Sequence, residues 1–111
     1  MAVRYLEQAL IIPDGATTSA SGIVAGALGV GLVVPAGLLG TALAPEMSLD
    51  GITWLPFFDD DGNALVIVVT AAARFIRLVP QEFAGFGRIR FVSNAAETGG
   101  PLTLTLILRA E

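Results

Sequence analysis

The chain has 111 residues, a length that suits one domain with a modest core of its own. Apolar residues make up 54% and charged residues only 14%, and this composition excludes a disordered chain, which needs low hydrophobicity and high net charge. The net charge of −4 argues against a nucleic-acid partner in the absence of a strong basic patch.

The first turn signal divides the chain into a short N-terminal segment and one domain. Residues 1–14 are predicted to form an N-terminal arm or first strand, and residues 15–111 a β-sandwich domain. The boundary lies at the Asp14-Gly15 pair, a common turn sequence. No secretory signal is expected, because Glu7 stands where a signal would be apolar.

The glycine-rich stretch over residues 22–45 is apolar and long enough to span a bilayer. A small membrane protein that uses this stretch is therefore one alternative. Against it, six glycines and Pro35 weaken a helix, and no Lys, Arg, Trp or Tyr flanks the stretch. We predict strands over 23–25 and 30–34 instead, with a turn over 26–29, and no membrane partner.

Four later segments have the periodicity of strands: Leu43–Leu49, Ala64–Thr70, Arg88–Val92 and Leu102–Leu108. The last places four leucines on one face. The run over 64–70 is continuously apolar and rich in β-branched residues, which is typical of a strand covered on both faces. With turn signals between these runs, the pattern predicts an all-β fold, a jelly-roll-like antiparallel β-sandwich of eight or nine strands.

The inventory of chemical groups is poor. The sequence contains no His, Lys or Cys, so the usual general base, the Schiff-base amine and the thiolate are all missing. No base is available to activate any of the four serines. We therefore predict a protein that is not an enzyme and uses no cofactor.

The densest polar cluster is Asp59-Asp60-Asp61-Gly62-Asn63. Asp59 and Asp61 are candidate cation ligands, because the spacing resembles the start of a calcium loop. However, Gly62 comes one place early, and Thr70 stands where a bidentate glutamate would be needed. We predict the tip of a hairpin here and no metal site, since Asp, Asn and Gly all favour turns.

The arginines of the second half form another candidate cluster: Arg74, Arg77, Arg88 and Arg90. Residues 1–61 contain seven acids and one arginine, for a net charge of −6. Residues 62–111 contain three acids and five arginines, for a net charge of +2. Three interpretations stay open: a patch that binds carboxylates or phosphates, salt bridges to the acidic half of a neighbouring subunit, and an ordinary solvated face.

Trp54 and Phe57 offer a stacking platform for sugar rings, and this gives the alternative of a carbohydrate-binding module. Packing in the core or at an interface is the competing interpretation. The composition itself favours interfaces, because sixteen charged residues cannot cover the outside of a chain with this much apolar side chain. We therefore expect an oligomer or a subunit of a larger assembly.

A series of short motifs runs through the domain in a characteristic order: Thr17-Thr18-Ser19, Gly29–Ala36, Ser48-Leu49-Asp50-Gly51-Ile52-Thr53-Trp54, Asp61-Gly62, Ala64–Thr70, Leu78–Gly85, Arg88-Ile89-Arg90-Phe91 and Leu102–Arg109. In this order they resemble a family of small tailed-phage virion structural proteins, β-sandwiches of the capsid decoration (cement) or head-spike type. That family often has a Ser-Gly-Thr and a Gln-containing loop before the last strand. Here Ser93–Gly100 takes that place, so the partner surface of the loop is not carried over.

The resemblance implies a structural role in the virion, on the capsid surface. The protein would bind the major capsid protein or another virion protein, as a homotrimer, and stabilise the shell. The alternative within the same resemblance is a tail-tip or head-spike module that binds carbohydrate.

Two sets of residues are expected to make these contacts. Val3, Arg4, Tyr5 and Leu6 lie in the N-terminal arm, which we expect to add a strand to a neighbour and to be dispensable for folding of the sandwich. Arg88 and Arg90 are expected to make polar contacts to an acidic neighbour.

Overall fold

The strands pair like one long hairpin that has been rolled up. The computed structural model describes residues 3–23, 26–69, 74–78 and 87–110. The first strand pairs with the last, the second with the one before it, and so on inward to β4, and all these pairs are antiparallel. The strands are β1 (Arg4–Ile12), β2 (Gly22–Ile23), β3 (Leu28–Val34), β4 (Ala42–Ser48), β5 (Leu55–Pro56), β6 (Ile67–Val68), β7 (Arg74–Arg77), β8 (Arg88–Ser93) and β9 (Leu102–Ala110).

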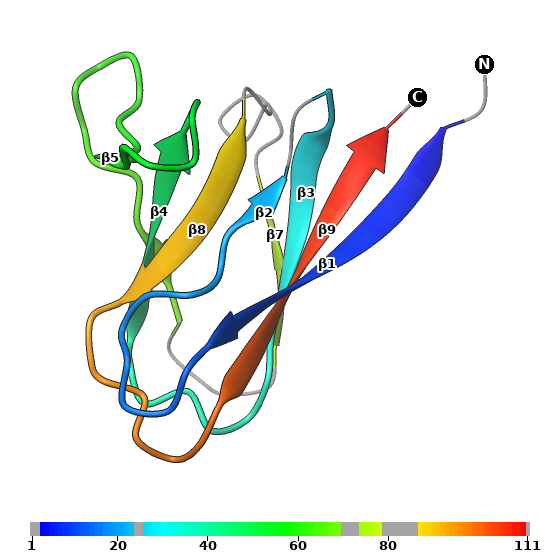
Figure 1. Cartoon of the computed structure of the whole chain (residues 1–111). Coiled ribbons are helices and arrows are strands. Elements are labelled where there is room, and N and C mark those ends of the chain that lie inside the picture. The colour runs from blue at the N-terminus through cyan, green and yellow to red at the C-terminus, as the bar shows by residue number, and fades with distance from the viewer. Residues whose placement is uncertain (1–2, 24–25, 70–73, 79–86, 111) are drawn as a thin grey trace.

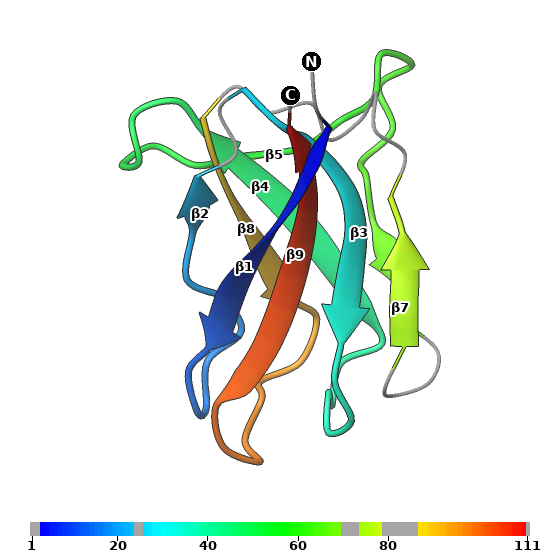
Figure 2. The same cartoon turned by 90° about the vertical axis from the view of Figure 1, so that its right-hand side faces the viewer.

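The rolled hairpin gives two facing sheets. One has the strand order β1-β9-β3-β7, and the other has the order β2-β8-β4-β5, with β6 also paired to β4. Figure 1 shows the two layers from the side, and Figure 2 looks on to the first sheet. This nested pairing is the arrangement of a jelly roll. The predicted all-β sandwich of about nine strands is confirmed.

The core lies between the sheets and is built by alternation along β9. Leu102, Leu104, Leu106 and Leu108 are all buried, while Thr103 on the other parity is exposed. From the facing sheet, Ile89 and Phe91 of β8 and Leu43 of β4 fill the same space, and β1 adds Leu10 and Ile12. Burial of each side chain of this size stabilises the folded state by about 1.5–3 kcal/mol.

The N-terminal segment is part of this sandwich. Residues 4–12 pair with β9 of the same chain along their whole length, from Arg4↔Ala110 to Ile12↔Leu102. The segment is therefore the first strand of the domain rather than an arm on a neighbour.

A side chain joins the two sheets where β1 and β2 approach. The Gln8 amide on β1 donates from Nε2 to the Ile23 carbonyl, and its Oε1 accepts from the Ile23 N–H at 3.0 Å. Further along, the Ala20 N–H donates to the Ile11 carbonyl at 2.8 Å. Gln8 thus pairs with β2 as a backbone would, and it closes this side of the sandwich over the second half of β1.

The prediction for residues 64–70 needs correction. Within the described part of this run, only Ile67–Val68 forms a strand, and it pairs with one end of β4 at the edge of its sheet. Val66 and Val68 are exposed, so the segment is not covered on both faces. Its apolar side chains alternate between the core and the surface; Thr70 lies outside the described residues.

Where the structure describes the glycine-rich stretch, it forms strands joined by turns and loops. Residues 28–34 form β3 and residues 42–48 form β4, so the helix required by the membrane alternative is not formed there. β3 begins two residues earlier than expected and contains a bulge between Gly29 and Gly31. Residues 24–25 of the expected first strand lie outside the described part. Among the described residues, no helix is long and apolar enough to cross a membrane.

Candidate functional site

The outer face of the sheet β1-β9-β3-β7 is a regular surface across four strands, and among the described residues few of its side chains are charged (Figure 2). Since the even-numbered residues of β1 and β9 point to the core, the odd-numbered ones point outward. The uncharged side chains on this outer face are Tyr5, Ala9, Ile11, Leu28, Val33, Phe75, Thr103, Thr105 and Ile107. The charged residues that the described strands place on it are Glu7, Arg77 and Arg109.

One aromatic side chain stands out from this face. Phe75 on the edge strand β7 is 64% exposed. Its ring leans over Gly31 of β3, because a Cβ placed on Gly31 would lie 2.7 Å from the Phe75 Cζ. Gly31 therefore provides the space that the ring occupies, and a larger residue there would displace it.

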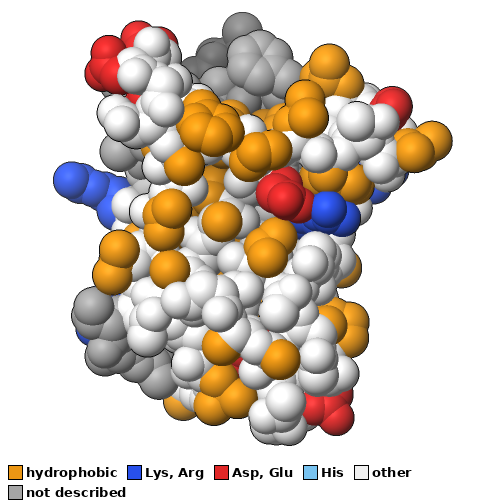
Figure 3. Space-filling model, turned by 90° about the vertical axis from the view of Figure 1, so that its left-hand side faces the viewer, with side chains coloured by type: hydrophobic (Ala, Val, Ile, Leu, Met, Phe, Trp, Pro, Cys, Tyr) orange, Lys and Arg blue, Asp and Glu red, His pale blue; other side chains and the backbone are white. Residues whose placement is uncertain are grey.

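The other sheet carries an ion pair on its outer face. The Arg90 Nε donates to the Glu46 Oε1 at 2.7 Å between β8 and β4, and the Arg90 guanidinium carbon lies 4.3 Å from the centre of the Trp54 ring. Figure 3 looks at this side and shows many apolar side chains over it and few charged ones. The exposed apolar residues on and around this sheet are Ile23, Leu49, Ile52, Leu55, Phe58, Val66 and Val68.

The predicted arginine cluster is divided between the two sheets. Arg74 and Arg77 lie on β7, whereas Arg88 and Arg90 lie on β8 of the facing sheet. Arg90 is already bound to Glu46 within the chain. Arg88 is exposed and passes beside Gly51, whose Cβ would lie 3.3 Å from the Arg88 Cδ. Of the two arginines expected to contact a partner, Arg88 is the more accessible.

Trp54 and Phe57 do not form the exposed platform of two rings that sugar stacking would need. The Arg90 guanidinium covers one face of Trp54, and Trp54 is only partly exposed. Phe57 is partly buried and packs against the core. The structure thus leaves at most one ring face of Trp54 for stacking.

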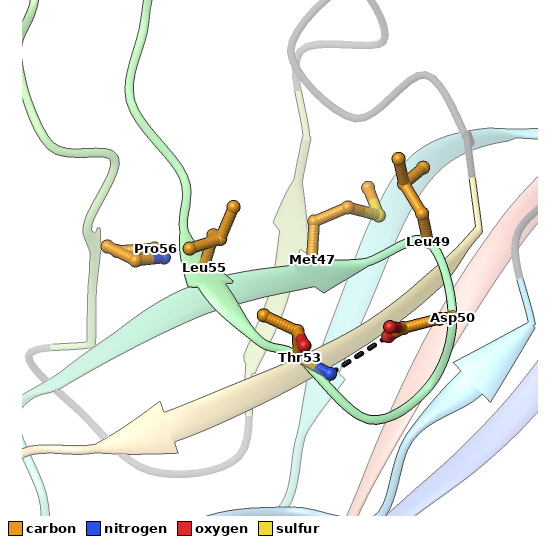
Figure 4. A pocket seen from close by; sticks show the side chains of 6 residues that line it. All are labelled: Met47, Leu49, Asp50, Thr53, Leu55 and Pro56. Carbon is orange, nitrogen blue, oxygen red and sulfur yellow. Dashed lines mark hydrogen bonds between the residues drawn. The ribbon is translucent and has the colours of Figure 1, made fainter.

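A pocket of about 300 Å³ lies in the loop between β4 and β5 (Figure 4). Its walls are mainly apolar, with one carboxylate, and consist of Met47, Leu49, Asp50, Thr53, Leu55 and Pro56. Asp50 holds the loop together. Its Oδ1 accepts hydrogen bonds from the backbone N–H groups of Ile52 and Thr53, both at 2.8 Å, and from the Ser48 hydroxyl at 3.0 Å.

These hydrogen bonds favour the ionised carboxylate. The backbone N–H groups of Thr53 and Ile52, followed by the Ser48 hydroxyl, lower the pKa of Asp50 below its ordinary value of 3.8. Because the pKa is depressed in the folded state, the stabilisation is fully present above about pH 3.8. It is lost as the pH falls through the lowered pKa.

This gives a prediction for the loop. In the wild-type chain, we expect the amide signals of Ile52 and Thr53 to shift with a midpoint below pH 3.8, as Asp50 is protonated. In an Asp50→Ala variant this transition should vanish, and both amides should exchange faster with solvent. Two-dimensional NMR across an acid titration measures both effects. A midpoint at or above 3.8 would contradict the assignment.

The aspartate cluster forms the tip of a hairpin, as predicted. Phe58 and Ala64 are bridged, and the Asp59 Oδ1 accepts from the N–H groups of Asp61 at 3.0 Å and Asn63 at 2.9 Å. The carboxylates of residues 59–61 lie within 4.8 Å of one another. Their geometry is that of an exposed acidic turn.

The predicted contact residues at the N-terminus lie at an open strand edge. Val3, Arg4, Tyr5 and Leu6 are all exposed. β9 covers one edge of β1, and the contacts of Gln8 and Ile11 cover the second half of the other. Before Gln8, no described residue pairs with that outer edge, so it has the form that accepts an added strand.

Sequence reasoning missed a buried glutamate at the loop end of the sandwich. Glu97 is only 1% exposed. Its carboxylate accepts from the N–H groups of Leu39 at 2.7 Å and Gly40 at 3.1 Å, and from the Ser93 hydroxyl at 2.9 Å. Its backbone pairs with Gly15 and Ala16. No periodicity or motif around residue 97 indicates this role, because the backbone donors Leu39 and Gly40 lie in a loop that is distant in the sequence.

No family model matches the chain, and no curated protein is similar to it.

Proposed function

We propose that the chain is a non-enzymatic structural protein of a tailed-phage particle, a decoration (cement) protein that binds the exterior of the capsid as a homotrimer. The observation that carries this proposal is the pair of outer faces, which expose apolar side chains on both sides of a small sandwich. Exposed apolar surface of this extent is typical of proteins that are covered by partners.

The fold is compatible with this role. Jelly rolls are used by viral capsid proteins and by lectins, among others. A fold alone does not assign a function, so the choice depends on the surfaces. The partly covered ring of Trp54 weakens the carbohydrate alternative, while the open edge of β1 and the accessible Arg88 suit contacts with protein neighbours.

The proposed mechanism is mechanical. The sandwich would act as a rigid spacer between neighbouring capsomers, and its broad faces would exclude water at the contacts. Val3, Arg4, Tyr5 and Leu6 would meet a neighbour at the open edge of β1, and Arg88 would pair with an acidic group of the major capsid protein. Each contact is individually weak, and many copies bound to one shell would stabilise it together.

The test is binding of the purified chain to particles of the phage that carries this sequence, after the native copies have been stripped off. We expect binding that raises the temperature at which the shells open. An Arg88→Ala variant should bind more weakly, with the larger loss at low salt, because salt screens exposed charges. Arg88→Lys keeps the charge and should retain most of the binding. Stripped shells that do not bind the wild-type chain would contradict the proposal.

A further inference from the structure

Opposite charges lie at the two edges of the outer face of the sheet β1-β9-β3-β7. One row across the four strands consists of Glu7, Ile107, Gly31 and Arg77. Glu7 and Arg77 are three strand spacings apart, about 14 Å, which is too far for an ion pair within the chain. Both are exposed, and among the described residues neither has a charged partner.

The neighbouring row is uneven in height. It consists of Ala9, Thr105, Val33 and Phe75. Small side chains occupy the β1 and β9 side, whereas the exposed ring of Phe75 forms a ridge on the β7 side. In this row the β1 and β9 side is therefore low and the β7 side is high, and Glu7 lies on β1 in the row beside it.

A twofold axis parallel to the strands relates these two halves to each other. If two copies pack this face together about such an axis, β1 of one copy lies over β7 of the other. Glu7 of each copy then meets Arg77 of its partner, twice in the complex. The ridge of each Phe75 lies over the low half formed by Ala9 and Thr105. Sheets packed at the usual spacing of about 10 Å leave room for these side chains to meet.

We propose that this face is a self-complementary contact between two copies of the chain. The occupant is a second copy because one surface supplies both members of each charge pair and both halves of the steric fit, as an isologous contact requires. By standard strand dimensions the face measures roughly 19 Å by 23 Å. Two such faces bury on the order of 1,000 Å², at the lower end for specific interfaces, so the pairing is reversible.

This contact uses one of the two outer faces on which the proposed function rests, so the threefold and capsid contacts would use the other sheet and the edges. Copies that associate only through this face form dimers. Trimers that also use it associate into larger assemblies, of which six chains is the smallest that pairs every face. An even number of chains in the assembly therefore indicates that this face is used, whatever particle the protein belongs to.

The experiment is sedimentation velocity of the full chain over a wide range of concentration. We expect the wild type to reach an even multiple of the 11.4 kDa chain. Glu7→Arg alone and Arg77→Glu alone place like charges opposite each other, and each should weaken the pairing by about tenfold or more. An equimolar mixture of the two variants should pair again, because each supplies the charge that the other lacks. Asp60→Arg, the same change at an exposed loop tip, should pair like the wild type.

Each outcome decides the inference. Rescue in the mixture supports the contact, and a loss of pairing in Phe75→Ser supports it independently. Circular dichroism checks that every variant is folded. A wild type that stays monomeric, or variants that associate like the wild type, would overturn it. If the wild type is a trimer and none of these substitutions changes its mass, the face contact is wrong, while the proposed function is unaffected.

Discussion

Replacing Glu97 with alanine is expected to lower the free energy of unfolding by about 3 kcal/mol or more. The variant leaves the N–H groups of Leu39 and Gly40 and the Ser93 hydroxyl without their acceptor. The hydrogen bonds of the Gly40 N–H and the Ser93 hydroxyl are buried. Each buried donor left without a partner costs about 1–3 kcal/mol, and the empty space left by the side chain adds to the loss. Urea unfolding followed by Trp54 fluorescence measures the change.

Two further variants separate the buried carboxylate from a general effect of losing an acid. Glu46→Ala removes a glutamate of the partly exposed pair with Arg90 and should cost less than about 1 kcal/mol. Glu97→Gln keeps the size of the side chain but points an amide donor at groups that are themselves donors. Its loss of unfolding free energy should therefore lie between the losses for Glu46→Ala and Glu97→Ala. Equal losses for Glu97→Ala and Glu46→Ala would show that Glu97 does not hold the loops together.

Deleting residues 1–12 is expected to prevent folding. The deletion removes β1, and with it nine residues paired to β9 and the fully buried side chains of Leu10 and Ile12. Burial of these two side chains alone contributes about 3–6 kcal/mol, a large part of the 5–15 kcal/mol that stabilises a typical domain. Far-UV circular dichroism and NMR signal dispersion should both report an unfolded chain.

The control for this deletion removes only residues 1–3, which precede β1. That shorter deletion should leave the sandwich folded with nearly unchanged thermal stability. A folded and cooperative chain that lacks residues 1–12 would mean that the segment is a detachable arm, as the sequence alone suggested, and that its pairing with β9 contributes little.

Local patterns were sufficient to predict the fold class. The alternation over Leu102–Leu108 and Arg88–Val92 specifies which side chains are buried, and the structure buries those leucines together with Ile89 and Phe91. The turn at Asp61-Gly62 also forms as predicted, because Asp, Asn and Gly favour it locally. Such signals involve neighbours in sequence, and they need no knowledge of the tertiary structure.

Features that depend on distant partners could not be predicted. The run over residues 64–70 has the composition of a central strand, but its place at the edge of a sheet is set by the pairing of β4 with β8 on the other side. The burial of Glu97 depends on two adjacent backbone donors, Leu39 and Gly40, which lie 58 and 57 residues away. The arginines were expected to gather, and the topology instead divides them between two sheets.

The most direct test of the proposed role is quantitative mass spectrometry of purified virus particles from the source of this sequence. We expect the chain to be present in a fixed ratio to the major capsid protein and to be lost when the shells are stripped. Added protein should restore the ratio to the same limit. Mature particles that contain none of the chain would contradict a structural role in the virion.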